Sequence, residues 1–111
     1  MEILKLNGEG PSPRKLSSLN YIDGLHVLVV YGGRYDDNSR NQTFNDIYLL
    51  DLINLTWFSV KVYDGIIKAR YEHCAVVSGN KIIVFGGMDD EMYIASDLYI
   101  ITVGKSELIY K

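Results

Sequence analysis

The sequence predicts an all-β protein built from short antiparallel strands. Its apolar residues fall in short bursts of strand length, and the bursts are separated by Gly, Asn, Asp and Ser. The bursts are rich in Val, Ile, Tyr and Trp, which suit a pleated sheet. No segment shows a convincing helical period, so strands are expected along the whole chain.

The expected strands follow the apolar bursts in chain order. Asp23-Gly24 and Gly79-Asn80 are signals for tight two-residue turns, because such turns between right-twisted strands require positive φ angles. Neighbouring strands are therefore expected to pair antiparallel. The expected strands span residues 2–6, 16–22, 25–31, 47–52, 57–62, 74–77, 82–85, 98–103 and 108–110.

Four landmarks occur twice in the same order, which indicates an internal repeat of about 50 residues. They are an Arg, an aromatic residue followed by two Gly, an Asp two residues before a Tyr, and a large apolar residue. The copies are offset by 56, 54, 51 and 51 residues. The landmarks are Arg14 and Arg70, Tyr31-Gly32-Gly33 and Phe85-Gly86-Gly87, Asp46-Ile47-Tyr48 and Asp97-Leu98-Tyr99, and Trp57 and Leu108.

The order of these landmarks resembles the kelch repeat. The resemblance is carried by Gly10-Pro11-Ser12-Pro13-Arg14, Val29-Val30-Tyr31-Gly32-Gly33, Asn45-Asp46-Ile47-Tyr48-Leu49-Leu50-Asp51 and Thr56-Trp57, with most of the pattern repeated in the second copy. It implies a β-propeller in which each repeat is one four-stranded blade. The fold expected is therefore a partial kelch-type β-propeller, with about two four-stranded antiparallel blades plus one leading outer strand.

The repeat divides the chain into three parts. Residues 1–13 are expected to be an outer strand and linker from a preceding blade, 14–62 blade one, and 63–111 blade two. Propellers close with about four to eight blades. We therefore expect further blades of a parent chain, or self-association through the unclosed sheet faces.

Several repeated residues are expected to serve the fold. The Gly pairs belong to no phosphate-binding pattern, and Gly at a strand end usually permits close backbone approach. The aromatic landmarks are expected to pack within the blades. These structural residues are Gly32, Gly33, Gly86, Gly87, Tyr48, Tyr99 and Trp57.

The loops after the two Gly pairs are the expected partner-binding surface. They cover residues 34–44 and 88–95 and are long for β-hairpins. Loops on a rigid scaffold commonly carry recognition, and Arg and Tyr are enriched at interfaces. The resemblance places such loops on one rim, with Arg14 and Arg70 bordering the same face. The rim residues expected to contact a protein are Arg14, Arg34, Tyr35, Asp36, Arg70, Met88, Asp89 and Asp90.

Composition narrows the partners and the compartment. A formal net charge of −3 and a pI near 5.2 argue against an electrostatic grip on nucleic acid. No apolar run approaches the roughly 18 residues of a membrane span, so no membrane partner is expected. Cys74 is the single cysteine, which fits a reducing compartment, and we expect a cytoplasmic protein. No cofactor or metal is expected.

The resemblance implies a non-catalytic protein-interaction module in an adaptor or scaffold role. The alternative is part of an enzyme, either an oxidase-type kelch propeller with a copper site or a regulatory kelch domain fused to a catalytic domain such as a phosphatase. Adjacent residues His73 and Cys74 point to opposite faces of a strand, so they are not expected to share one site. Cys74 is expected to be a buried structural thiol.

Overall fold

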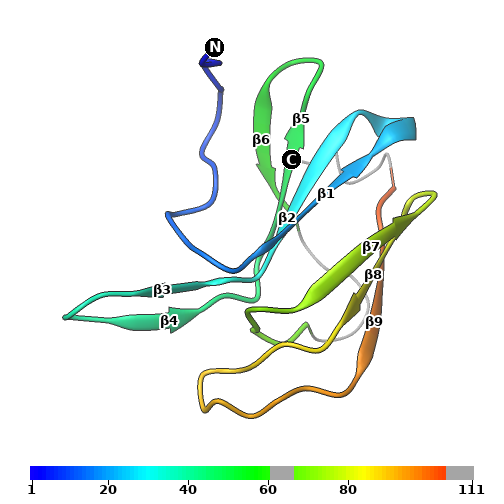
Figure 1. Cartoon of the computed structure of the whole chain (residues 1–111). Helices are drawn as coiled ribbons and strands as arrows, with labels where there is room; N and C mark the ends of the chain where they lie inside the picture. The colour runs from blue at the N-terminus through cyan, green and yellow to red at the C-terminus, as the bar shows by residue number, and fades with distance from the viewer. Residues whose placement is uncertain (61–66, 105–111) are drawn as a thin grey trace.

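The computed structural model describes residues 1–60 and 67–104 as two antiparallel sheets that lie against each other (Figure 1). Blade one has the strand order β1-β2-β5-β6, and blade two has the order β7-β8-β9. The all-β prediction is confirmed. Blade one contains β1 (Ser18–Ile22), β2 (Val27–Tyr31), β5 (Ile47–Asp51) and β6 (Thr56–Ser59); blade two contains β7 (Cys74–Ser78), β8 (Lys81–Phe85) and β9 (Leu98–Thr102).

A small hairpin and one helical turn complete the described structure. β3 (Arg34–Asp36) and β4 (Asn41–Thr43) pair antiparallel and project from blade one (Figure 1). The turn is the 3-10 helix η1 (Asp23–Leu25). In the part of the chain that the structure describes, no helix has the length and apolar character needed to cross a membrane.

The strand positions follow the sequence repeat. β7 begins 56 residues after β1, β8 begins 54 after β2, and β9 begins 51 after β5. Their registers agree as well, since Ser18 pairs with Tyr31 in blade one and Cys74 with Phe85 in blade two. The two repeats are therefore two copies of one sheet.

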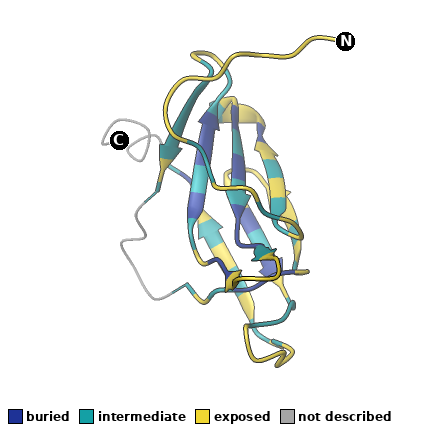
Figure 2. Cartoon of the chain, turned by 90° about the vertical axis from the view of Figure 1, so that its left-hand side faces the viewer, coloured by how far each residue is buried: buried dark blue, intermediate teal, exposed yellow. Residues whose placement is uncertain are grey.

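The core lies between the two sheets. Val27, Val29 and Tyr31 alternate along β2 and are buried, while Ile82 and Val84 of β8 are buried in turn. In Figure 2 the buried, dark blue stretches lie on the central strands of the view, with exposed, yellow stretches on the strands and loops around them. Each sheet thus covers one face of the other, and this burial supplies the main stabilisation.

The strand predictions for residues 2–6 and 16–22 need correction. Residues 2–6 form no strand, and Ile3 stays 85% exposed. Asn7, the next residue, bridges to Thr56 of β6 in parallel. Leu16 has a φ of +61°, so the strand expected from residue 16 begins at Ser18.

The turn expected at Asp23-Gly24 is longer than two residues. Ile22 pairs with Val27, and the connection contains η1 followed by His26, which takes the left-handed conformation with φ +53°. By contrast, the Gly79-Asn80 turn is confirmed, since Ser78 pairs with Lys81 and Gly79 has φ +61°. The strand expected at 108–110, and residues 61 and 62 of the strand expected at 57–62, lie outside the described residues.

Candidate interaction rim

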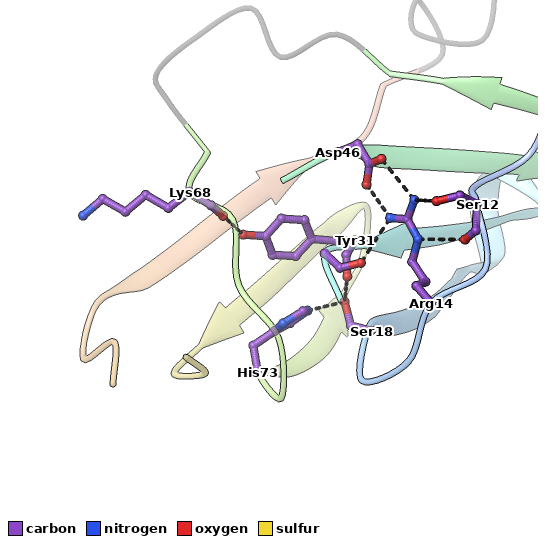
Figure 3. Close-up of polar contacts among 8 residues, drawn as sticks. Ser12, Arg14, Ser18, Tyr31, Asp46, Lys68 and His73 are labelled. Atoms are coloured by element: carbon purple, nitrogen blue, oxygen red, sulfur yellow. Dashed lines mark hydrogen bonds and ion pairs between the residues drawn. The ribbon is translucent and has the colours of Figure 1, made fainter. Parts of the chain in front are cut away.

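The Arg14 guanidinium lies beneath the loop that follows the first Gly pair. It donates two hydrogen bonds to the Asp46 carboxylate, one to the Gly32 carbonyl at 3.2 Å and one to the Ser12 carbonyl at 3.1 Å (Figure 3). Its guanidinium carbon lies 3.8 Å from the centre of the Phe44 ring. Arg14 therefore ties the N-terminal segment to the start of β5.

Arg70 repeats this arrangement in blade two. Its guanidinium donates to both oxygens of Asp97, at 3.1 and 3.3 Å, and to the Gly86 carbonyl at 2.9 Å. Arg70 is only 2% exposed and lies over the Tyr99 ring at 4.5 Å. Burial by itself would raise the pKa of Asp97, but the hydrogen bonds and charge of Arg70 outweigh it and lower that pKa.

The expectation that Arg14 and Arg70 contact a partner needs correction. The side chain of Arg14 is 5% exposed and that of Arg70 is 2% exposed. Because each guanidinium is held by a carboxylate and a Gly carbonyl of its own blade, both side chains support the rim from below.

Gly32, Gly33 and Gly87 occupy close backbone approaches, whereas a Cβ on Gly86 would meet nothing within 4 Å in the described part of the chain. Gly32 has φ +69°, and a Cβ placed on it would lie 2.6 Å from the Arg70 carbonyl oxygen. Gly87 has φ +92°, and its Cβ would lie 2.7 Å from the Tyr71 carbonyl oxygen. Both positions combine a left-handed conformation with no room for a side chain. Gly33 and Gly86 share the positive φ.

Tyr48 and Trp57 pack edge to face on blade one, with ring centroids 6.3 Å apart. A Cβ on Gly10 would lie 2.7 Å from the indole nitrogen of Trp57, so the N-terminal segment passes directly over the ring. Trp57 thus anchors this segment to β6.

The first rim loop is the β3–β4 hairpin, which carries a group of charged side chains. The Asp36 carboxylate forms ion pairs with Lys15 at 3.1 Å and with Arg34 at 3.4 Å. The hydrogen bond from Lys15, and then the other contacts with both cations, lower the pKa of Asp36.

The tip of this hairpin is held by Asp37. Its carboxylate accepts the Tyr35 hydroxyl at 2.6 Å and the backbone N–H groups of Ser39 and Arg40 at 2.8 and 2.9 Å. The Arg40 guanidinium lies over the Tyr35 ring at 4.4 Å. The Tyr35 hydrogen bond lowers the pKa of Asp37 and raises that of Tyr35. The loop is therefore ordered by its own contacts before any partner binds.

The second rim loop exposes three consecutive apolar side chains. Asp89 accepts the backbone N–H groups of Glu91 and Tyr93, at 2.9 and 3.0 Å, and so closes the loop. Met92, Tyr93 and Ile94 are 71%, 68% and 80% exposed as a result. The site predicted from sequence omitted these three residues, although an apolar run inside an acidic loop was the signal that could have identified them.

One contact joins the two rim loops. Arg34 donates to Asp90 at 3.3 Å and to the Thr43 hydroxyl at 2.9 Å, and its guanidinium lies 5.1 Å from the Tyr71 ring centre. The structure thus brings Arg34, Asp36 and Asp90 together. Met88 and Asp89 are half-buried, and Tyr35 contacts Asp37 and Arg40 instead.

A pocket of about 320 Å³ lies beside the second rim loop. Two acidic residues, Asp89 and Asp97, and the large apolar residues Tyr93 and Ile94 are among those that line it. Its lining comprises residues 68–70, 88–89 and 93–97. We define the rim as the β3–β4 hairpin, the loop 88–95 and this pocket.

Below the rim, the blades meet through His73. Its Nε2 shares a hydrogen bond of 2.9 Å with the Ser18 hydroxyl, and the Tyr31 hydroxyl donates to the Lys68 carbonyl at 2.6 Å (Figure 3). Burial raises the pKa of Tyr31 to about 12. Burial, followed by the charge of Arg70, lowers the pKa of His73 to about 4.

Cys74 is not the buried thiol that the sequence predicts. Its side chain is exposed, because it lies on the face of β7 that points away from blade one. His73 is half-buried against Tyr31, in line with the opposite orientation expected for these neighbours. Across residues 1–60 and 67–104, no three His, Cys, Asp or Glu side chains cluster as a metal would require.

Comparison with known proteins shows which family has this architecture. Residues 1–109 match the KLHDC2/KLHL20/DRC7 Kelch-repeats domain. The chain is 35% identical over 80 residues to dynein regulatory complex subunit 7 of Chlamydomonas reinhardtii, covering 72% of the chain and 7% of that protein. It is 31% identical over 122 residues to mouse Kelch domain-containing protein 1, covering 89% of the chain and 30% of that protein.

A third relative is protein ral2 of Schizosaccharomyces pombe, 40% identical over 95 residues, covering 79% of the chain and 15% of that protein. The chain therefore spans less than a third of the length of these curated relatives. The domain match covers nearly the whole chain and agrees with the two repeated sheets and their paired Arg–Asp contacts. This chain belongs to the Kelch-repeat family.

Proposed function

We propose that the chain is a protein-binding module of adaptor or scaffold type, and that its rim contacts the partner. The observation that carries this proposal is the exposed Met92-Tyr93-Ile94 run, which lies on an ordered loop beside the pocket. Large apolar side chains presented by a rigid scaffold are typical of protein-interaction sites. Kelch-repeat relatives support protein interaction as the general role.

The acidic and apolar character of the second rim loop suggests the kind of surface it fits. Asp89, Asp90 and Glu91 precede the apolar run, and Asp90 is the one that already pairs with Arg34. A partner with an apolar patch bordered by Lys or Arg would complement this loop. The first rim loop adds the ordered Tyr35 and Arg40 side chains beside it.

The proposal also includes the cellular compartment and the absence of catalysis. We propose cytoplasmic binding without catalysis by this chain, on the basis of its single cysteine and of the family. One relative, a tRNA wybutosine-synthesizing protein 2/3/4 of Oryza sativa, is named for an enzymatic pathway, and the chain covers 8% of it. That relative keeps the alternative, a kelch segment within an enzyme, open to test.

The test compares proteins captured by the wild-type chain with those captured by rim variants. Arg34→Ala/Tyr35→Ala and Tyr93→Ala/Ile94→Ala remove contact groups from the two loops. Ile53→Ala is the matched control, because Ile53 is 73% exposed in the β5–β6 turn at the other end of blade one (Figure 1). Circular dichroism checks that each variant folds.

Partners that are retained by Ile53→Ala and lost from either rim variant support the proposal. If every captured protein binds the folded rim variants and the wild-type chain equally, the rim is not the contact surface. In that case the proposed function fails.

A further inference from the structure

Blade two leaves an apolar sheet face uncovered on the side away from blade one. Two cross-strand rows make up this face: Cys74, Phe85 and Leu98, then Val76, Ile83 and Ile100. Val76, Phe85, Leu98 and Ile100 are 51–59% exposed. An apolar patch of this kind on a folded protein marks an interaction surface.

The internal repeat shows what covers such a face. The positions of Phe85, Leu98 and Ile100 correspond to Tyr31, Ile47 and Leu49 in blade one, by the offsets 54 and 51. Those blade-one residues are at most 3% exposed, because blade two packs on them. The open face is thus the counterpart of a face that another kelch sheet already covers in this chain.

The backbone hydrogen bonds between the blades allow the covered face to be compared with the open face without reference to side chains. Where blade two meets blade one, Gly33 N–H donates to the Arg70 carbonyl at 2.8 Å, and Arg70 N–H donates to the Phe44 carbonyl at 3.2 Å. Glu72 N–H donates to the Leu16 carbonyl at 3.0 Å. These bonds fix how the segment entering one blade crosses the rim of the other.

The repeat equivalents of these donors are unpaired. Gly33, Arg70 and Glu72 correspond to Gly87, Arg14 and Leu16, and within residues 1–60 and 67–104 the backbone N–H groups of the latter three have no hydrogen-bond partner. The local conformation is nevertheless the same, since Leu16 has φ +61° and Glu72 φ +59°. One side of an interblade junction is therefore already formed at each end of the molecule.

Glycine spacing agrees with this open junction. A Cβ on Gly32 would meet the Arg70 carbonyl at 2.6 Å, whereas a Cβ on Gly86, the equivalent residue, meets nothing within 4 Å in the described part of the chain. The space that Arg70 fills beside blade one is open beside blade two. Arg14 is the residue that corresponds to Arg70.

Blade one carries the matching surface. Leu19 and Tyr21 are 61% and 43% exposed on its outward face. They correspond to Ala75 and Val77 of β7, the strand that lies against β1 in the chain. Leu19 and the backbone N–H groups of Arg14 and Leu16 are thus the blade-one counterparts of the groups through which blade two contacts blade one.

We propose that a second copy of this chain docks head to tail, seating its blade one on the open face of blade two. The unpaired donors then find partners: Gly87 N–H of one copy meets the Arg14 carbonyl of the next, whose Arg14 and Leu16 N–H groups meet the Ala95 and Glu72 carbonyls. A heterologous contact of this kind forms a ring when its rotation closes. Propellers close with about four to eight blades, so two to four copies complete one.

The test blocks each face in turn and then mixes the blocked chains. Val76→Asp places a charge on the open face of blade two, and Leu19→Asp places one on blade one. Ile53→Asp is the control, since Ile53 is exposed in the β5–β6 turn and lies on neither face. Solution mass is measured by light scattering over a concentration series in reducing buffer, with circular dichroism to verify folding.

The wild-type chain and Ile53→Asp should form a discrete species of two to four copies, and each blocked variant should be monomeric. The mixture of the two blocked variants should give a 1:1 dimer, because one compatible pair of faces remains. Maleimide labelling of Cys74, which lies on the covered face, should be slower in the assembled wild-type chain than in monomeric Leu19→Asp.

Three results overturn the proposal. They are a monomeric wild-type chain at all concentrations, association that survives both blocking substitutions, and a mixture of folded variants that stays monomeric. Loss of association in Val76→Asp alone also overturns it, because that outcome indicates that two blade-two faces pair with each other. The blocking substitutions at Val76 and Leu19 lie outside the rim, so the proposed function is tested separately.

Discussion

The imidazole of His73 packs on the phenol ring of Tyr31, with ring centroids 4.8 Å apart, and so joins the second blade to the first. The pair sits where the segment entering blade two crosses the end of β2. Arg70 lies three residues before His73 and adds a positive charge to the same region. The contact between blades therefore depends on a histidine that stays neutral.

This contact predicts a loss of stability at mildly acidic pH. The pKa of His73 is lowered to about 4 in the folded chain, from an ordinary value of 6.5. As pH falls from about 6.5 to about 4, the unfolded chain takes up a proton that the folded chain does not, so folding stability decreases across that window. Above about pH 6.5 both states are neutral at this residue, and its effect is absent.

His73→Gln isolates this effect. In denaturant unfolding over a pH series, the wild-type chain should lose stability relative to His73→Gln between about pH 6.5 and 4. His26→Gln is the control, because His26 is exposed in the β1–β2 connection. An unchanged pH profile in His73→Gln would show that His73 does not titrate as the structure indicates.

The buried guanidinium of Arg70 predicts that lysine cannot replace it. A single ammonium cannot serve both the Gly86 carbonyl and the Asp97 carboxylate in the geometry that the planar guanidinium provides. Arg70→Lys should therefore lower the free energy of unfolding by about 2–3 kcal/mol.

The matched control for Arg70 is Arg40→Lys at the exposed hairpin tip, which should change stability by no more than about 0.5 kcal/mol. Urea unfolding at neutral pH measures both. Equal stability of Arg70→Lys and the wild-type chain would contradict a structural role for the guanidinium.

The Gly pairs offer a matched comparison within one chain. Gly32→Ala and Gly86→Ala both place a side chain at positive φ, which costs about 1 kcal/mol or more. At Gly32 the new Cβ would also strike the Arg70 carbonyl, whereas at Gly86 it meets nothing nearby in the described residues. Measured on monomers carrying Leu19→Asp, Gly32→Ala should be the more destabilising of the two. Equal losses would argue against the close approach at Gly32.

The contact between rim loops predicts a weak, salt-dependent coupling. Arg34 is 16% exposed and Asp90 is 59% exposed, so solvent screens the pair. A double-mutant cycle with Arg34→Ala and Asp90→Ala should give a coupling of about 0.2–1 kcal/mol that shrinks as salt is added. A coupling that does not respond to salt would indicate that the two loops interact by packing instead.

Local features of the fold could be predicted from the sequence because they depend on nearby residues. Short apolar bursts predicted the paired strands, and the repeat predicted that β7, β8 and β9 copy β1, β2 and β5. Gly79 predicted positive φ in the same way, since only Gly takes it without a steric cost.

The expected rim was predicted only in part. Arg34, Asp36 and Asp90 do come together, because each lies at a fixed distance after a Gly pair. Met92, Tyr93 and Ile94 were missed, since their exposure depends on how Asp89 closes the loop through backbone hydrogen bonds. No local pattern reports such a closure.

By itself the sequence determined the all-β class, the strand order within a repeat and the family. These features depend on apolar bursts, turn residues and repeated glycine landmarks, each of which acts over a few neighbouring residues. The tertiary structure decided burial. It placed Arg14 and Arg70 beneath the rim, left Cys74 exposed and gave residues 2–6 no strand. Burial and strand pairing require a surface supplied from elsewhere in space, and a pattern along the chain does not contain that surface.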